Sequence, residues 1–138
     1  MNITKVCLEE MKGIVDMIHK TWNEVDQRKD MGMTLDIDWD SFKMLEDQNC
    51  LHMYTFEDKG YAVFMLVPDL HRKGQIQAVS NVVYIEKEYR GEFNSLLELI
   101  KVDLRDQGAD FLSMVVKARE EDELYGMRLF EKTYQEKL

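Results

Sequence analysis

The sequence has 138 residues, the usual length of one domain. Its 18 lysines and arginines against 27 acidic residues give a net charge of −9, whereas proteins that bind a nucleic-acid duplex usually carry a basic surface. No stretch approaches the roughly 18 consecutive apolar residues of a membrane-spanning helix, and the N-terminus lacks a signal-peptide pattern. We therefore expect a single cytoplasmic domain over residues 1–138, without nucleic-acid or membrane partners.

The two cysteines, Cys7 and Cys50, are far apart in the sequence and fit no metal-binding or redox spacing. We expect both to be buried thiols rather than a disulfide, because nothing in the sequence indicates secretion. His, Cys, Asp and Glu residues nowhere recur with the spacing of a known metal motif. The sequence therefore predicts no metal site.

The first part of the chain predicts one strand and two helices. A short strand is expected over 2–8, and an amphipathic helix over 9–25, where apolar residues recur at spacings of three and four. Residues 27–37 have no clear period and are interpreted as a loop. A second, shorter helix is expected over 38–48. Two aspartates are candidates for its N-cap: Asp38 and Asp40.

The middle of the chain predicts three strands. "LHMYTF" (51–56) and "YAVFMLV" (61–67) are rich in aromatic and apolar residues, and "EDKG" between them is typical of a hairpin turn. Pro68 closes the second of these strands. The run "IQAVSNVVYIE" (76–86) is long and β-branched, which favours another strand.

The last third predicts a helix, a strand and a less regular end. An apolar stripe that begins at Phe93 marks a helix, and Gly108 is expected as its C′ residue. A strand is expected over 110–116, a short helix and turn within 119–130, and a final edge strand over 131–138. The element order is therefore β-α-α-β-β-β-α-β-α-β. The unit from 76 to 116 consists of a strand, a helix and a second strand. It should therefore be a right-handed parallel crossover within a mixed sheet.

Three segments carry a resemblance to a known family: "DIDWDSFKMLED" (36–47), "VPDLHRK" (67–73) and "SNVVYIEKEYRG" (80–91). In this order and spacing they resemble the GNAT superfamily of acetyl-CoA-dependent N-acetyltransferases, and within it a branch common in tailed-bacteriophage genomes. The resemblance extends from about residue 35 to the end. It implies an α/β (α+β) fold, with a mixed, mostly antiparallel sheet of about six strands flanked by helices.

The resemblance also implies that acetyl-CoA binds between two diverging strands and over the helix that follows. In the family, backbone N–H groups of the turn and helix start hold the pyrophosphate, because a helix N-terminus has unpaired donors and a positive dipole end. The residues at these positions are Val83, Tyr84, Ile85, Arg90, Gly91, Glu92, Phe93, Asn94 and Ser95.

The turn departs from the family pattern Arg-x-x-Gly-x-Gly/Ala. Arg90 and Gly91 match its start, but Phe93 and Ser95 stand where the motif has glycines, which allow a close approach of the backbone. If Phe93 points into the core, the loop still admits a phosphate. If it points into the groove, it fills the pyrophosphate site. The sequence leaves both arrangements open.

Three residues are implied for the reaction itself. His71 would be a base near the acceptor site, and Asn81 stands where the branch often has Asp. An amide can bind a substrate but cannot act as a general base. Tyr125 in "LYGMRLF" matches the tyrosine that protonates the leaving thiolate, although a shifted match instead aligns Tyr134 with a tyrosine of the last strand. Trp39 would line the acceptor pocket.

Together these features predict an acyl-CoA-dependent N-acetyltransferase that acts on an amine, either a small molecule or a protein. The alternative is a catalytically inactive bacteriophage protein of the same fold, which binds a protein partner or forms part of the virion. The missing motif glycines, the Asn in place of Asp and the unclear Gly-Phe motif favour this alternative. The net charge alone would fit an acidic decoy for a basic partner. The sequence leaves the oligomeric state open, and a homodimer is one option because many relatives of this kind pair.

Overall fold

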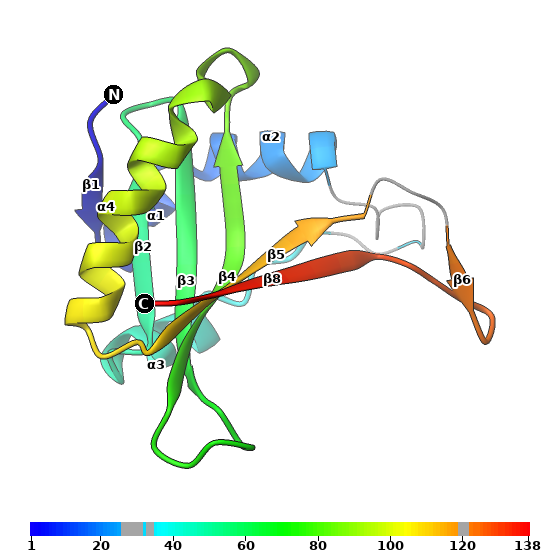
Figure 1. The fold of residues 1–138 in the computed structure, drawn as a ribbon. Coiled ribbons are helices and arrows are strands. Elements are labelled where there is room, and N and C mark those ends of the chain that lie inside the picture. Colours follow the sequence, from blue (N-terminus) through cyan, green and yellow to red (C-terminus); the bar gives the residue numbers. More distant parts are fainter. Residues whose placement is uncertain (26–31, 33–34, 119–121) are drawn as a thin grey trace.

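The computed structural model describes residues 1–25, 32, 35–118 and 122–138. A six-stranded sheet in the order β1-β2-β3-β4-β5-β8 forms its centre, and β6 and β7 pair separately (Figure 1). The strands are β1 Thr4–Val6, β2 Leu51–Thr55, β3 Gly60–Pro68, β4 Ile76–Ile85, β5 Phe111–Lys117, β6 Glu123–Leu124, β7 Met127–Arg128 and β8 Glu131–Lys137. The helices are α1 Leu8–Lys12, α2 Val15–Val25, α3 Trp39–Asp47 and α4 Phe93–Asp106, with a 3₁₀ helix, η2, over Lys87–Glu92.

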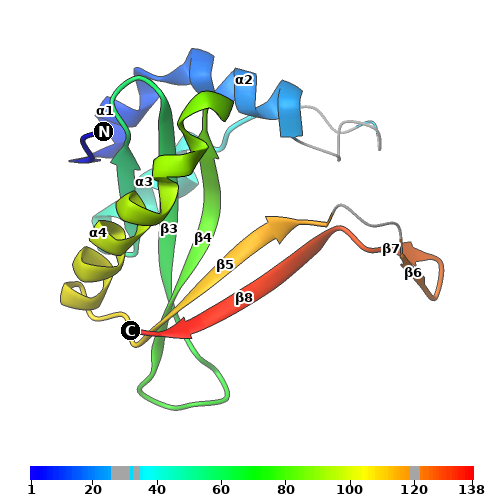
Figure 2. The ribbon, with the colours of Figure 1, turned by 45° about the horizontal axis from the view of Figure 1, so that its top comes forward.

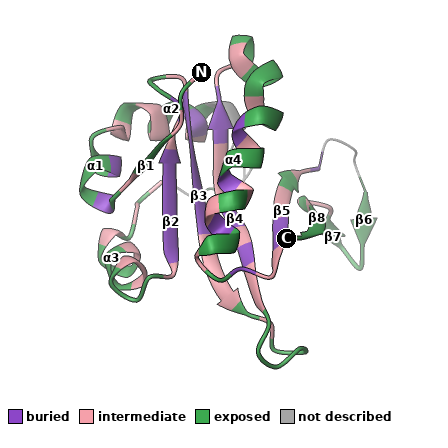
Figure 3. Ribbon diagram, turned by 60° about the vertical axis from the view of Figure 1, so that its left-hand side comes forward, coloured by how far each residue is buried: buried purple, intermediate pink, exposed green. Residues whose placement is uncertain are grey.

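The sheet lies between two helical layers. Helix α4 covers one face, and α1, α2 and α3 lie against the other (Figures 1 and 2). Successive strand residues point to opposite faces, so β2 and β3 contribute to both cores. Phe64 packs with Ile100 under α4, whereas Met53 and Tyr61 pack with Met11 on the opposite face. Buried residues accordingly concentrate in β2, β3 and β4 (Figure 3).

Most elements expected from the sequence are confirmed. Strands β2 and β3 form the antiparallel hairpin, and β4 and β5 form the parallel pair joined through α4. Helix α4 ends in a Schellman motif, in which Gly108 has a φ of +105° and donates to the Arg105 carbonyl. Asp38, and not Asp40, caps α3 by accepting a hydrogen bond from the Ser41 amide at 3.0 Å.

The prediction of one continuous helix over 9–25 is wrong. The chain forms α1 and α2, separated by a turn at Gly13 and Ile14. The Gly13 amide closes α1 by donating to the Glu10 carbonyl, and glycine is a poor helix former in any case. The apolar residues keep their helical spacing across the break, so periodicity alone could not reveal the break.

The helix expected within 119–130 is also wrong for the described part of that segment. Residues 122–130 contain the β6–β7 hairpin instead. Its turn residues Tyr125 and Gly126 both have positive φ, +52° and +79°, which is the backbone that a type I′ hairpin turn requires. Most of the loop expected over 27–37 lies outside the described residues.

Both cysteines are free thiols, as expected, but their predicted burial is wrong. Cys7 is exposed and Cys50 is half-buried. Cys7 lies at the N-cap of α1, where its amide donates to Glu10 Oε1 at 3.1 Å. None of the helices in the described part of the chain has the length and apolar character needed to span a bilayer.

Stability should fall between about pH 7 and pH 5 because of His52. This side chain is 2% exposed, its Nε2 contacts the Asn49 carbonyl at 3.1 Å, and its Nδ1 has no partner. Burial lowers the pKa of His52, so the folded state resists protonation that the unfolded chain accepts below its pKa of about 6.5. The free energy of unfolding should drop by up to about 1.4 kcal/mol per pH unit until the lowered pKa is reached.

Urea unfolding at a series of pH values would measure this slope, with His52→Gln and His19→Gln compared. His19 is exposed on α2, so its variant should keep the slope, while the His52 variant should lose it. An unchanged slope in His52→Gln would contradict the assignment.

Candidate functional site

Strands β4 and β5 separate after a short stretch of pairing. Their parallel register covers three positions, Gln77 with Phe111, Ala78 with Leu112 and Val79 with Ser113, although both strands continue beyond it. At the branch point the Val115 amide donates to Ser80 Oγ at 2.8 Å, so a side chain takes the place of a carbonyl of β4. Beyond that contact the two strands diverge (Figures 1 and 2).

A β-bulge lies at the point of divergence. Against β3, Val82 pairs with Val63 and Ser80 pairs with Phe64, so Asn81 is an extra residue without a partner in the register. A bulge bends its strand and increases the local twist. The bend in β4 at Asn81 is therefore a physical reason why β4 leaves β5 at this level, and the exposed Asn81 side chain lines the resulting space.

The backbone of β4 faces this opening at Val83. The Glu86 amide donates to the Lys59 carbonyl at 2.8 Å, which makes Gly60 and Ile85 a non-hydrogen-bonded pair in the antiparallel ladder. Pair types alternate along such a ladder, so Val83 also belongs to a non-hydrogen-bonded pair. Its N–H and C=O consequently point away from β3 and toward the opening, where an extended amide-containing ligand could bind them.

The turn after β4 is helical rather than an open loop. In η2 the Tyr89 amide donates to the Glu86 carbonyl at 2.9 Å, and the Phe93 amide donates to the Arg90 carbonyl. Arg90 also donates from Nε to the Ile85 carbonyl at 3.2 Å. The helical run thus begins near Lys87, six residues before α4. Cofactor binding by this turn stays a prediction for its residues Arg90, Gly91, Glu92, Phe93, Asn94 and Ser95.

The sequence left open whether Phe93 points into the core or into the groove, and the structure places it between these two arrangements. It is half-buried and packs edge-to-face on Phe56, with ring centroids 6.5 Å apart. It also borders the cavity, so its ring forms part of the wall.

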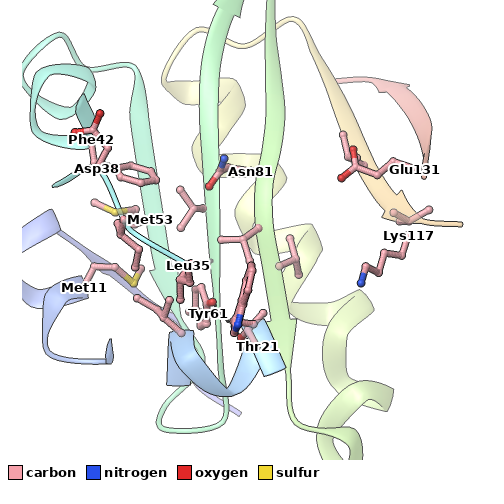
Figure 4. Close-up of a pocket in the computed structure, with 18 of the residues that line it drawn as sticks. Met11, Thr21, Leu35, Asp38, Phe42, Met53, Tyr61, Asn81, Lys117 and Glu131 are labelled. Atoms are coloured by element: carbon pink, nitrogen blue, oxygen red, sulfur yellow. Dashed lines mark hydrogen bonds between the residues drawn. The ribbon is translucent and has the colours of Figure 1, made fainter. Parts of the chain in front are cut away.

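A cavity of about 670 Å³ extends from α1, α2 and α3 across β3 and β4 to β5 and β8 (Figure 4). Much of its wall is apolar, formed by Leu8, Met11, Ile18, Trp22, Leu35, Ile37, Trp39, Phe42, Met53, Val63, Val82, Val83, Phe93, Met114, Val115, Val116 and Phe130. Its polar side chains are Thr21, Asp36, Asp38, Tyr61, Asn81, Lys117 and Glu131.

A pair of hydroxyl groups lies at the bottom of the cavity. Tyr61 is 3% exposed and donates to Thr21 Oγ1 at 3.1 Å, and Thr21 in turn donates to the Met17 carbonyl. Burial raises the pKa of Tyr61, so its phenol is neutral at physiological pH. Sequence reasoning missed this pair, because Tyr61 in an aromatic hairpin strand reads as an ordinary core residue.

Charged groups lie at both ends of the cavity. Asp36 and Asp38 precede α3, while Lys117 and Glu131 are cross-strand partners on β5 and β8. The Ser41 hydroxyl and amide hold the pKa of Asp38 below its usual range. Sequence reasoning also missed Asp36 and Glu131, because nothing local indicates that residues so far apart share a cavity. In the described part of the chain, no three His, Cys, Asp or Glu side chains are grouped as a metal site would need.

The structure brings only some of the expected site residues together. Asn81 and Trp39 line the cavity. His71 is exposed in the β3–β4 loop, where its amide donates to Asp69 Oδ1 at 2.9 Å, and it does not line the cavity. Tyr125 is 91% exposed at the tip of the β6–β7 hairpin, also outside the cavity. Their proposed catalytic roles stay predictions.

Tyr84 and Ile85, expected beside the cofactor, are both buried. Tyr84 packs against Tyr61 with ring centroids 6.2 Å apart, on the face of α1 to α3. Ile85 packs into the core under α4. Any contact they make with a ligand in the opening would therefore come from the backbone.

No known family model and no curated protein sequence matches this chain. Its structure is similar to a probable acetyltransferase from Staphylococcus epidermidis, with a TM-score of 0.67, 9% identity and coverage of 99% of this chain and 98% of that one. It is also similar to a ribosomal-protein-alanine N-acetyltransferase from Brucella melitensis, with a TM-score of 0.63, 16% identity and full coverage of both chains.

A third similar structure is an aminoglycoside acetyltransferase from an uncultured soil metagenomic sample, in complex with sisomicin. Its TM-score is 0.59 at 11% identity, over 82% of this chain and 75% of that one. At sequence identities this low, the similarity to these structures shows the fold alone. The mixed, mostly antiparallel sheet with one parallel pair is the GNAT fold expected from the sequence.

Proposed function

We propose that the protein transfers an acyl group, in the simplest case acetyl, from acyl-CoA to an amine. The observation that carries this proposal is the separation of β4 from β5 beyond Val79, with a cavity passing between them. Support also comes from the fold, which three acetyltransferases share. The Val83 N–H and C=O fit the amides of a pantetheine arm, because an extended chain can bind them as a further strand would.

The residues of this chain that would hold the cofactor are the β4 backbone at Val83 and the segment from Arg90 to Ser95. Bound acyl-CoA supplies a thioester carbonyl that an amine can attack. The hydrogen bonds within η2 leave its first turn, at Lys87, as the helix end where an anion would be favoured. Within the segment from Arg90 to Ser95, nothing lies within 4 Å of the position that a Cβ on Gly91 would occupy.

The charged residues of the cavity suit an ammonium group. An amine must lose its proton before it can attack, and Asp36 and Glu131 are carboxylates that line the cavity. Ser41 stabilises the charged form of Asp38 and lowers its pKa, which makes this carboxylate less suited to accept a proton. Asn81 binds the acceptor but takes no proton. The apolar wall excludes water and strengthens these interactions.

The same wall indicates an amphipathic acceptor. Met11, Trp39, Phe42 and Met53 belong to one hydrophobic cluster and line the same cavity as Asp36. An amine with an aliphatic or aromatic body would bury that body here while its ammonium group meets a carboxylate. Burying one aromatic ring contributes roughly 1.5–3 kcal/mol, or about 10- to 100-fold in kcat/KM.

Calorimetry with acetyl-CoA, followed by a turnover assay with an amine series, tests this function. We expect binding, and we expect 2-phenylethylamine to be acetylated at least about tenfold more efficiently than ethanolamine, which lacks the ring. Absence of both binding heat and thermal shift at millimolar acetyl-CoA would overturn acyl transfer. Turnover with the reverse preference would overturn only the acceptor class.

A binding role without turnover is favoured by a different observation. The Tyr89 and Phe93 amides are used within η2, and neither His71 nor Tyr125 lines the cavity. The chain would then bind a partner protein, as an interaction or virion component of a bacteriophage. Acetyl transfer to any amine would exclude this role, whereas binding of acetyl-CoA without turnover would support it.

A further inference from the structure

Strand β8 leaves one edge of the sheet open. It pairs with β5 on one side, and it is the last strand in the sheet that the described residues form. Its seven residues contain no proline, its register with β5 runs without a bulge, and none of its side chains is buried. An edge of this kind presents unpaired N–H and C=O groups to any other strand.

The hydrogen bonds to β5 show which residues face that edge. The Ala118 amide donates to the Phe130 carbonyl at 3.1 Å, and the Leu138 amide donates to the Asp110 carbonyl at 3.0 Å. These bonds make the Lys117–Glu131 and Phe111–Lys137 pairs non-hydrogen-bonded toward β5. Because the pattern alternates, the outward groups belong to Glu131, Thr133, Gln135 and Lys137.

The sequence of β8, "EKTYQEK", is complementary in charge to itself when read antiparallel. With Tyr134 opposite Tyr134 of a second copy, Glu131 lies opposite Lys137 and Lys132 lies opposite Glu136. Each of these pairs occurs twice, since a two-fold contact is isologous. Opposite charges in directly facing positions stabilise strand pairs.

Hydrogen bonding selects the same register. With Tyr134 at the two-fold axis, the outward residues Glu131 and Lys137 face each other, as do Thr133 and Gln135. A shift by one residue would set outward groups against inward ones and lose the hydrogen bonds. A shift by two residues would restore the bonds but remove the charge pairs. One register therefore satisfies both requirements.

We propose that two copies of this chain associate through antiparallel β8 strands, with the two-fold axis at Tyr134. Tyr134 is 61% exposed on the single chain, and in a non-hydrogen-bonded pair its ring would face its symmetry mate directly. Glu136 already forms an ion pair with Lys101 at 2.7 Å. Its carboxylate has two oxygens, so it can accept both from Lys101 and from Lys132 of the second copy.

The pairing also reaches the cavity. Glu131 lines the cavity on the β8 side, and the proposed register sets Lys137 of the second copy against it. The dimer would therefore set the charge at that end of the cavity.

Sedimentation velocity over a wide concentration range tests the dimer and its register. The wild-type protein is expected to reach a dimer and no larger species, because pairing uses the one open edge of β8. Lys137→Glu places like charges opposite each other twice and should raise the dimer dissociation constant at least about tenfold. The double variant Lys137→Glu with Glu131→Lys restores opposite charges and should recover most of that loss.

Two further variants complete the test. Lys73→Glu makes the same charge change in the exposed β3–β4 loop and should leave the dissociation constant unchanged. Thr133→Pro removes an outward N–H and should abolish the dimer, with circular dichroism confirming the fold. A wild-type monomer at all concentrations would overturn the proposal. A dimer that Lys137→Glu weakens no more than Lys73→Glu does would equally overturn it.

Discussion

Replacing Val115 by tryptophan should weaken the binding of acetyl-CoA at least about 100-fold, or roughly 2.7 kcal/mol. Val115 is half-buried, lines the cavity and is fixed at the branch point by its hydrogen bond to Ser80. An indole at this position fills the space between the diverging strands, which the proposed cofactor site needs. Titration calorimetry measures the effect directly.

Val102→Trp is the matched control. Val102 is 48% exposed on α4 and outside the cavity, so the same change in size there should leave binding unaltered. Both variants should unfold at temperatures close to that of the wild type. If Val115→Trp folds and binds acetyl-CoA normally, the cofactor does not enter between β4 and β5, and the proposed site is wrong even if the protein has activity.

Replacing Gly60 by alanine should lower the free energy of unfolding by about 3 kcal/mol, at the upper end for overpacking. Gly60 is buried at the start of β3 and pairs with Ile85. A Cβ there would strike the Tyr84 carbonyl oxygen, and it would come within 2.9 Å of Phe56 Cδ2 and 3.0 Å of Ile85 Cα. Two of these contacts are backbone atoms of β4, so the strand itself would have to move.

Urea denaturation measures this loss, which should lower the Tm by roughly 10 °C. Gly91→Ala serves as the comparison, because its Cβ would meet no atom within 4 Å and its φ is not positive. That variant should change stability by less than about 1 kcal/mol. Equal losses in the two variants would show that close packing at Gly60 is not the cause.

Only part of the candidate site could be predicted from the sequence. Asn81 and Val83 were expected beside a ligand because of the resemblance to the GNAT superfamily, and both line the cavity. Asp36, Tyr61 and Glu131 were not expected there, because they come from three separate elements that only the folded sheet brings together. Local patterns carry no information on such distant neighbours.

The sequence by itself determined the elements whose signals are local. Two aromatic-rich runs around a turn signal predicted the β2–β3 hairpin, and an apolar stripe with Gly108 predicted α4 and its end. The tertiary structure alone decided where β4 leaves β5 and where Asn81 bulges. Pairing of strands depends on register between segments distant in sequence, and one inserted residue changes it without altering the period of either strand.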